Sequence, residues 1–365
     1  MKSALTWLCS NLPVFIAAAF FIGAAVLCSG CYTLKQGTTM LGYLNKAIPL
    51  EDLATEETAS EDDRRFVRRV EEIRRFAMED LGLKESKNYT RYVELDRDYL
   101  AAVVSASAKD SFTRYEWWFP VVGKVPYKGF FNIEGARKER TKLEKKDLDV
   151  WVRGVDAFST LGWFKDPLYS YMKKYSDRDL AELIIHELLH ATVFLKNHSQ
   201  FNEELAEFVG TEGARLFMER THSRNTDDPE TAGHAQADNA AYLAFIRGLI
   251  TELDELYKSD APREEKLKRK EEIINRAKLS FDENYDTLFK TENYRGFSKL
   301  SVNNAYLELF RLYYEEEHYF KDLYEKSGND LPKFIAAAAT LSSRIKQGKG
   351  KGNPKEELEK ALGLR

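Results

Sequence analysis

The sequence predicts an α+β fold in which a small N-terminal sheet precedes one buried helix and a mainly helical C-terminal lobe follows it. Short runs of valine and aromatic residues, separated by proline and glycine, predict strands between residues 89 and 131. Ser176 and Asp179 form a predicted capping box, and the apolar residues from Leu180 to Val193 predict a helix buried on nearly all sides. After Gly213 the apolar positions recur at helical spacing in several long stretches.

Residues 1–31 differ in kind from the rest of the chain. Lys2 is the only charge before an apolar run that ends at Cys28. A positive start, an apolar middle and a small-residue end predict a secretory signal. The segment Leu27-Cys28-Ser29-Gly30-Cys31 resembles a bacterial lipoprotein signal, which implies that Cys31 is lipidated and becomes the mature N-terminus. The alternative is an uncleaved anchor helix, because about 17–20 apolar residues can just span a bilayer.

Both alternatives attach the rest of the chain to a membrane of the bacterial cell envelope, on the periplasmic side. All three cysteines, Cys9, Cys28 and Cys31, lie in this leader. The mature chain is therefore expected to form no internal disulfide, and any metal site must use histidine and carboxylate ligands. A net charge of −4 over the whole chain gives no nucleic-acid footprint. The sequence does not indicate an oligomeric state.

The N-terminal half is expected to alternate helices and strands. Residues 32–63 are polar and predict a tether or a loose first helix. From residue 64 to residue 81 apolar positions recur at helical spacing, and Gly82 ends this amphipathic helix. Residues 132–146 predict a strongly charged helix, and residues 149–159 return to a strand pattern.

The C-terminal half is predicted to be helical. Helical patterns cover residues 229–258, 263–276, 303–324 and 331–345. The glycine and lysine residues that follow predict a mobile tail. The expected organisation is a signal at 1–31, a tether at 32–63, one folded domain at 64–346 and a tail at 347–365.

The buried helix carries the motif His186-Glu187-Leu188-Leu189-His190. Residues four apart lie one above the other on a helix, so both imidazoles project from one face. Two nitrogen ligands in this arrangement can bind a zinc ion at about 2.0–2.1 Å each. Glu187 lies roughly 100° around the helix from His186, where it can reach a metal-bound water without being a ligand. The alternative is a core helix whose histidines are hydrogen-bonded to their neighbours.

A third ligand is expected on the next helix, because a catalytic zinc site has three protein ligands and an open fourth position. The segment 201–207 is expected to start that helix with Asn202 as its N-cap. Glu203 and Glu207 are four apart and share a face, whereas Glu204 lies on another. One carboxylate of the Glu203/Glu207 pair could bind the metal while the other fixes a ligand imidazole.

This arrangement resembles the gluzincin metallopeptidases, in which an Asn-Glu-x-x-x-acid helix follows the His-Glu-x-x-His helix. The resemblance implies a zincin-like fold with zinc held by His186, His190 and Glu203. It also implies that Glu207 holds a ligand histidine and that Glu187 is the general base. Only 12 residues, 191–202, separate His190 from Glu203, fewer than in the thermolysin-like members. The connection between the two helices must therefore be tighter.

Further segments resemble the bacterial family of predicted, lipoprotein-like aminopeptidases. They are Phe119-Pro120-Val121-Val122-Gly123-Lys124-Val125-Pro126-Tyr127-Lys128-Gly129-Phe130, Ala157-Phe158-Ser159-Thr160-Leu161-Gly162-Trp163-Phe164-Lys165-Asp166-Pro167 and Asn303-Asn304-Ala305-Tyr306. With the two helices they extend the resemblance over nearly the whole mature chain. It implies that residues 64–346 form a zinc metallopeptidase domain that acts on peptides.

Two further roles are left open by the sequence. Peptide hydrolysis needs one donor besides the metal for the developing oxyanion. Tyr306 and His234 are the candidates, and Tyr306 is favoured because it belongs to the Asn303–Tyr306 match. An aminopeptidase also needs an anionic group that faces the free amine of the substrate. The candidates for this group are Glu204, Glu134 and Asp156.

The expected function is zinc-dependent peptide-bond hydrolysis by an aminopeptidase anchored to the bacterial envelope. One alternative is a membrane-linked zinc endopeptidase. The other is a zinc-binding lipoprotein without catalytic activity. The intact Glu187 argues against this last alternative, because metal ligation alone does not require an acid at that position.

Overall fold

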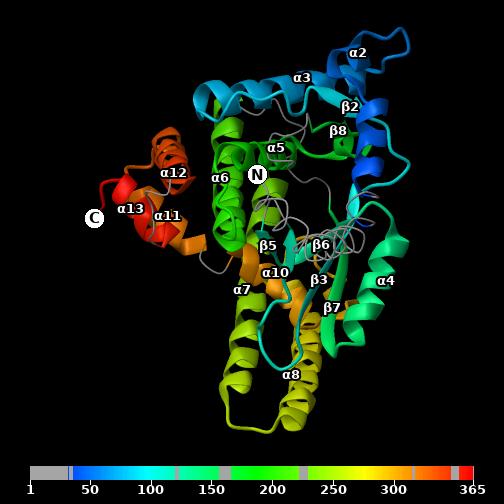
Figure 1. The fold of residues 1–365 in the computed structure, drawn as a ribbon, viewed down its shortest axis with the longest axis vertical. Coiled ribbons are helices and arrows are strands. Elements are labelled where there is room, and N and C mark those ends of the chain that lie inside the picture. Colours follow the sequence, from blue (N-terminus) through cyan, green and yellow to red (C-terminus); the bar gives the residue numbers. More distant parts are fainter. Residues whose placement is uncertain are drawn as a thin grey trace, which may run out of the picture. The chain divides into compact units, whose positions relative to one another are not determined.

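The computed structural model describes residues 32, 36–119, 123–155, 166–221, 229–314, 317–346 and 353–364. The chain divides into two units, residues 1–47 and residues 48–365. In the first unit residues 36–46 are helical, and the expected signal with Cys31 lies outside the described residues. The elements labelled in Figure 1 belong to the second unit. In the described part of the chain, no helix has both the length and the apolarity needed to cross a membrane.

The second unit begins with a small sheet and two helices. Sheet A has the order β1–β2–β8, with β1 antiparallel and β8 parallel to β2. Its strands are β1 (Ile48–Pro49), β2 (Arg91–Val93) and β8 (Leu168–Tyr169). The helices are α2 (Leu50–Thr55) and α3 (Glu61–Arg75), and a π-helical segment (Phe76–Asp80) continues α3. Regular structure thus starts inside the expected tether, since β1, α2 and the first turn of α3 lie within residues 32–63.

Helix α3 begins where the sequence supplies a capping box. The backbone N–H of Asp63 donates to the Ser60 hydroxyl at 3.1 Å, and the N–H of Ser60 donates to the Asp63 carboxylate at 3.0 Å. The Asp63 carboxylate also forms an ion pair with Lys173 at 2.9 Å. The apolar face of α3 is buried through Phe66, Val67, Val70 and Ile73, which confirms the amphipathic helix predicted from residue 64.

Sheet B is antiparallel and has the order β6–β3–β7. Its strands are β3 (Ala101–Ala108), β6 (Tyr127–Phe130) and β7 (Leu148–Val155), and a separate hairpin pairs β4 (Trp117–Phe119) with β5 (Gly123–Val125). Ser105 of β3 lies opposite Tyr127 on one side and opposite Trp151 on the other. Residues that are in register across strands project from the same face, so these three side chains form a row.

Helices cover both faces of sheet B. Helix α10 (Asn304–Tyr314) lies on the face of the row, where Tyr306 packs against Trp151 with ring centroids 4.8 Å apart. Helix α4 (Ile133–Glu144) places Glu139 within 3.5 Å of Lys128 in β6. Lys128 follows Tyr127 in the strand and therefore points to the opposite face. The two helices thus enclose the sheet between them.

Helices α5 (Asp177–Thr192) and α6 (Ser199–Thr221) pack closely against each other, and a 3-10 segment (Ser170–Lys174) leads into α5 (Figure 1). Glycines in α6 allow this approach. A Cβ atom on Gly210 would lie 3.1 Å from the Glu182 carbonyl oxygen and 3.2 Å from the His186 Cβ. A Cβ atom on Gly213 would lie 3.1 Å from the Ile185 side chain. A Cβ atom at either position therefore requires the neighbouring atoms of α5 to shift by a few tenths of an ångström.

A helical lobe follows. Helices α7 (Pro229–Lys258) and α8 (Arg263–Glu283) form a hairpin, seen at the bottom of Figure 1, and α9 (Tyr285–Leu288) and a 3-10 segment (Phe297–Lys299) come after it. The core of the lobe is rich in aromatic rings, among them Tyr242, Phe281, Tyr285, Phe289, Phe297 and Tyr306. The aromatic residues of this part of the sequence therefore serve mainly as core.

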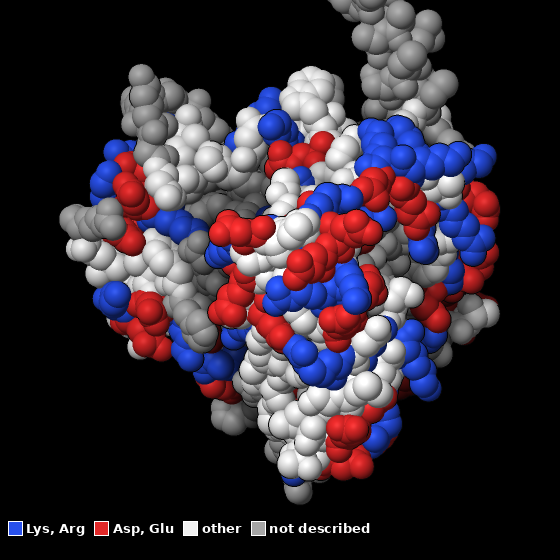
Figure 2. Space-filling model, turned by 90° about the horizontal axis from the view of Figure 1, so that it is seen from below, with Lys and Arg blue, Asp and Glu red and all other residues white. Residues whose placement is uncertain are grey.

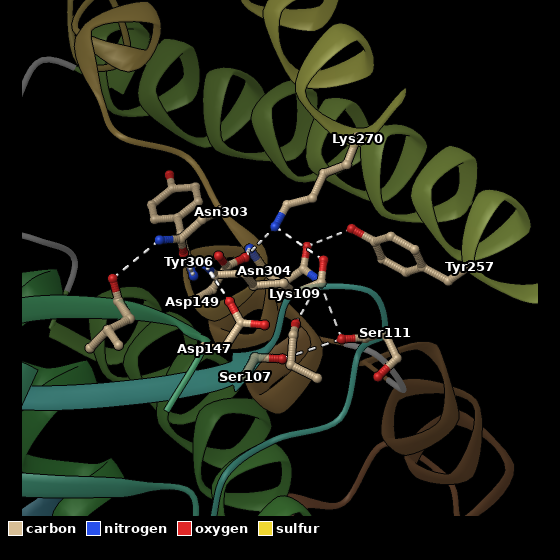
Figure 3. A network of polar contacts seen from close by, with 12 residues as sticks. Ser107, Lys109, Ser111, Asp147, Asp149, Tyr257, Lys270, Asn303, Asn304 and Tyr306 are labelled. Carbon is tan, nitrogen blue, oxygen red and sulfur yellow. Dashed lines mark hydrogen bonds and ion pairs between the residues drawn. The ribbon is translucent and has the colours of Figure 1, made fainter. Parts of the chain in front are cut away.

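A buried polar network anchors this lobe to sheet B (Figure 3). Lys270 of α8 has a side chain only 3% exposed and forms an ion pair with Asp149 of β7. The Asp149 carboxylate also accepts the backbone N–H of Asn304 at 2.9 Å. The Asn304 side chain donates to carbonyl oxygens in the turn after β3 and accepts from the Tyr257 hydroxyl at 2.8 Å. Because each buried charge has a partner, the network fixes α8 and α10 on the sheet.

The chain ends in α11 (Glu317–Lys326), α12 (Leu331–Lys346) and α13 (Pro354–Ala361). Leu358 of α13 is completely buried, and α13 packs against α12. The last part of the segment expected to be a mobile tail, residues 347–365, therefore contains a packed helix. The fold of the described residues is mixed α+β, mostly helical with small sheets. On the face shown in Figure 2, acidic and basic side chains are interspersed.

We predict that Gly210→Ala lowers the free energy of unfolding by about 1 kcal/mol. Overpacking costs about 1–3 kcal/mol, whereas alanine in a helix interior gains about 1 kcal/mol over glycine. Gly248→Ala in α7 is the matched control, because no atom lies within 4 Å of its added Cβ, and it should stabilise the protein. Chemical denaturation measures both variants. Equal stabilisation by both would contradict the close packing of α5 and α6.

A second prediction concerns acid stability. The Ser60 hydroxyl, together with Lys173, lowers the pKa of Asp63 from 3.8 to about 2. The folded state therefore favours the charged carboxylate, and this stabilisation is complete above about pH 4 and is lost as the pH falls through about 2. Asp63→Asn should lower the free energy of unfolding by about 1–2 kcal/mol at pH 7. The difference from the parent should disappear below about pH 2 in urea denaturation, and a difference that stays constant with pH would refute this explanation.

Candidate metal centre

Helix α5 presents two imidazoles to one side. The Ser176 hydroxyl caps the helix by accepting the Asp179 N–H at 3.1 Å, which is one of the two hydrogen bonds of a capping box. His186 and His190 lie one turn apart, with ring centroids separated by 5.0 Å. Their side chains are 14% and 9% exposed, so both rings are nearly buried and have limited contact with solvent.

Helix α6 presents a carboxylate to the same place. Glu203 Oε2 lies 3.6 Å from His186 Nε2 and 3.7 Å from His190 Nε2. Glu207, one turn further along α6, places Oε2 at 3.6 Å from the other ring nitrogen of His186, Nδ1. The structure thus brings together His186, His190, Glu203 and Glu207. Glu203 lies next to the Nε2 atoms of both histidines, and Glu207 lies next to Nδ1 of His186.

The spacing of the three donor atoms fits a shared metal ion. At 3.6–3.7 Å the Glu203 oxygen is too far from either nitrogen for a normal hydrogen bond. Donors at about 2.0–2.2 Å from a tetrahedral ion are about 3.4 Å apart, close to the observed separations. His186, His190 and Glu203 are the group identified as able to hold a metal among the described residues. Two imidazoles and one carboxylate are a ligand set that zinc accepts.

Charge complementarity also links these groups. Burial alone lowers the pKa of His186, but the carboxylates of Glu203 and Glu207 outweigh it and hold this pKa well above its ordinary value. Burial alone raises the pKa of Glu203, but His190 and His186 hold this pKa well below its ordinary value. A metal ligand must be deprotonated, so the affinity of a metal held by these residues would fall as the pH falls.

Asn202 explains how so short a connection delivers Glu203 to the site. Its side-chain oxygen accepts the Leu195 N–H at 2.9 Å, and its Nδ2 donates to the Leu195 carbonyl at 2.8 Å. The expectation that Asn202 caps α6 was wrong, because α6 already begins at Ser199. Asn202 instead ties the loop between the two helices to the first turn of α6. The buried Leu195 then provides a fixed point from which Glu203 extends toward α5.

Glu187 is buried with 7% exposure, although it carries a carboxylate. A tyrosine that the sequence reasoning missed lies near it: Tyr89 is 1% exposed, and burial followed by the carboxylates of Glu187 and Asp166 raises its pKa well above the ordinary value. Tyr89 has a left-handed backbone with φ of 60°, uncommon outside glycine. Glu187 therefore lies in a buried region that it shares with Tyr89 and Asp166.

A second missed residue touches the cluster directly. The Tyr127 hydroxyl, at the start of β6, donates to Glu203 Oε1 at 3.1 Å. Tyr127 lies in one of the segments that resemble the predicted aminopeptidases, but nothing in its spacing relates it to a residue 76 positions away. The signal that could have found it is the strand alternation, which puts Tyr127 and Lys128 on opposite faces.

The other candidates lie elsewhere. Tyr306 belongs to the aromatic core, where its hydroxyl shares a hydrogen bond with Tyr242, and its role as an oxyanion donor stays a prediction. His234 lies in α7, one turn before Asp238, and its role as an oxyanion donor also stays a prediction. Glu204 is completely buried, accepts from Gln200 at 3.0 Å and lies 3.4 Å from Lys355. Glu134 is an exposed residue of α4 that pairs with Arg137. Asp156 and Cys31 lie outside the described residues.

Comparison with known proteins gave one family. A family model described as "Putative aminopeptidase" matches residues 31–351 of the chain. This range includes α5, α6 and Tyr127 and ends before α13. No curated protein and no solved structure matched the chain.

We predict that the full chain binds one divalent metal ion and that its two acidic neighbours contribute unequally. Glu203→Ala removes a donor and should nearly abolish metal retention, whereas Glu207→Ala should weaken affinity by about 10–100-fold. Glu219→Ala is the control, because this exposed residue of α6 pairs with Arg215 and should change nothing. Metal analysis after dialysis and titration with a chelator measure the order. Stronger loss in Glu207→Ala than in Glu203→Ala would mean that the two roles are reversed.

Proposed function

Because this chain belongs to the putative aminopeptidase family, we propose that it is a zinc-dependent peptidase of the gluzincin type. The observation that carries the proposal is the convergence of His186, His190 and Glu203 with donor separations of 3.6–3.7 Å, beside the buried carboxylate of Glu187. Family membership supports peptidase activity, and the cluster supports a metal-assisted version of it.

Zinc is the metal we propose, because two imidazoles and one carboxylate suit a four-coordinate ion with one open position. When bound, zinc lowers the pKa of water toward about 7 and polarises the scissile carbonyl. In this proposal His186, His190 and Glu203 hold the ion, and Glu207 fixes the orientation and tautomer of the His186 ring through Nδ1.

Glu187 acts as the general base in this proposal. Its carboxylate accepts a proton from the attacking water and then delivers it to the amine nitrogen that leaves the peptide bond. Tyr306 and His234 remain the candidates for the donor to the oxyanion.

We further propose that the α5–α6 pair and the adjacent sheets form a zincin-like domain. The location that we propose is the bacterial cell envelope, with the chain tied to a membrane through a lipid on Cys31 or through an anchor helix in the leader. The support for this location comes from the composition of residues 1–31.

A zinc endopeptidase is the second candidate. One observation favours it: Glu204, which could have received the substrate amine, is completely buried and lies 3.4 Å from Lys355. A carboxylate in that position cannot reach a substrate without breaking this ion pair. Incubation of the full chain with matched free and N-blocked peptides separates the candidates. Cleavage of free peptides alone supports an aminopeptidase, equal cleavage of both supports an endopeptidase, and no cleavage across a broad panel favours a zinc-binding lipoprotein without activity.

We predict that Glu187→Gln stays folded and zinc-loaded but loses at least about 10²-fold in peptidase rate, the usual scale for a general base. Glutamine keeps the shape of the side chain but cannot accept the proton near neutral pH. Rates must be compared at equal zinc occupancy, since a metal-depleted sample would give the same loss. A variant that cleaves as fast as the parent would place the base elsewhere.

A further inference from the structure

We propose that Tyr127 is a positioning residue that holds the Glu203 carboxylate in a one-oxygen mode toward the metal, an inference that rests on the proposed function. The two oxygens of Glu203 have different neighbours. Oε1 accepts the Tyr127 hydroxyl at 3.1 Å, and Oε2 lies 3.6 and 3.7 Å from the two imidazoles. The two oxygens of Glu203 therefore face different partners.

The hydrogen bond between Tyr127 and Glu203 joins sheet B to helix α6. Glu203 comes from the first turns of α6, and Tyr127 begins β6, which lies at the edge of sheet B among the described strands. On the opposite face Lys128 is held by Glu139 of α4 at 3.5 Å. The strand is thereby fixed from behind, and its alternation aims Tyr127 at α6.

The same row of side chains separates Tyr127 from Tyr306. Tyr127, Ser105 and Trp151 lie in register across β6, β3 and β7. Neighbouring strands are about 4.8 Å apart, so Tyr127 and Trp151 are separated by about 10 Å. Tyr306 packs against Trp151, at the far end of that row. Of these two tyrosines, Tyr127 is the one whose hydroxyl touches a residue of the metal centre.

The hydrogen bond has a chemical consequence. A carboxylate whose two oxygens are both accessible can rotate and bind a metal through both of them, which raises the coordination number. A donor on Oε1 occupies one of those oxygens and leaves Oε2 for the ion, so the fourth position of a tetrahedral site stays open. Glu207 constrains His186 in the same way, at Nδ1. Two of the three expected ligands thus have a further partner: His186 has Glu207 of α6, and Glu203 has Tyr127 of β6.

The test replaces only the hydroxyl. Tyr127→Phe keeps the ring and should weaken zinc affinity by about 10–100-fold, measured by competition with a chelating indicator on the full chain. Tyr92→Phe is the matched control, because the Tyr92 hydroxyl also donates to a carboxylate, that of Glu94 at 2.5 Å, but in sheet A. It should leave zinc affinity unchanged. Thermal melting of both variants without metal checks that the fold is retained.

A second measurement reports the coordination number of the bound metal, whereas the first reports its affinity. Cobalt(II) replaces zinc in such sites and gives visible absorption bands that are strong for four-coordinate and weak for five-coordinate ions. The parent and Tyr92→Phe should show the strong bands, and Tyr127→Phe should show weaker, shifted bands because Glu203 is free to use both oxygens. A Tyr127→Phe protein with the parent's zinc affinity and the parent's cobalt spectrum would overturn the inference. A parent that binds neither metal would overturn the proposed function itself, and is recognised without any variant.

Discussion

Helices α5 and α6 must approach closely enough for one carboxylate to serve two imidazoles, and the rest of the site depends on that approach. Gly210 makes it possible, since an added Cβ would meet the backbone of α5 at 3.1 Å. Asn202 then sets where along α5 the carboxylate arrives, through two hydrogen bonds to Leu195. Burying two histidines and a glutamate would otherwise cost several kcal/mol. The approach offsets this cost by giving each charged group a partner of opposite sign.

The helix pair is itself held from two sides. From the segment between β3 and β4, Arg114 donates to Gln200 at 3.0 Å, and Gln200 donates to Glu204 at 3.0 Å. From the C-terminal end of the chain, Lys355 of α13 lies 3.4 Å from the same Glu204. The acidic neighbour of Glu203 is thereby neutralised, and the first turns of α6 are fixed by side chains from both directions. Rigid support of this kind is what a metal ligand needs to keep its orientation.

Features that depend only on the spacing of residues along one helix could be predicted from the sequence. Four-residue spacing put His186 and His190 on one face of α5, and Glu203 and Glu207 on one face of α6, as the structure has them. Features that depend on contacts between distant segments could not be predicted. Asn202 resembles an N-cap locally, but its partner is a loop residue, and Tyr127 reaches Glu203 only because of strand register.

The Asn303–Tyr306 motif shows a related difficulty, because a family pattern does not say what each residue does. The structure uses Asn304 to tie α10 to Asp149 and the turn after β3, and it uses Tyr306 as core.

The most direct test of the central claim is an anomalous difference map at the zinc edge from crystals of the purified protein. The account predicts one peak, about 2.0–2.2 Å from His186 Nε2, His190 Nε2 and Glu203 Oε2. A peak at other residues, or none from zinc-supplemented protein, would contradict it.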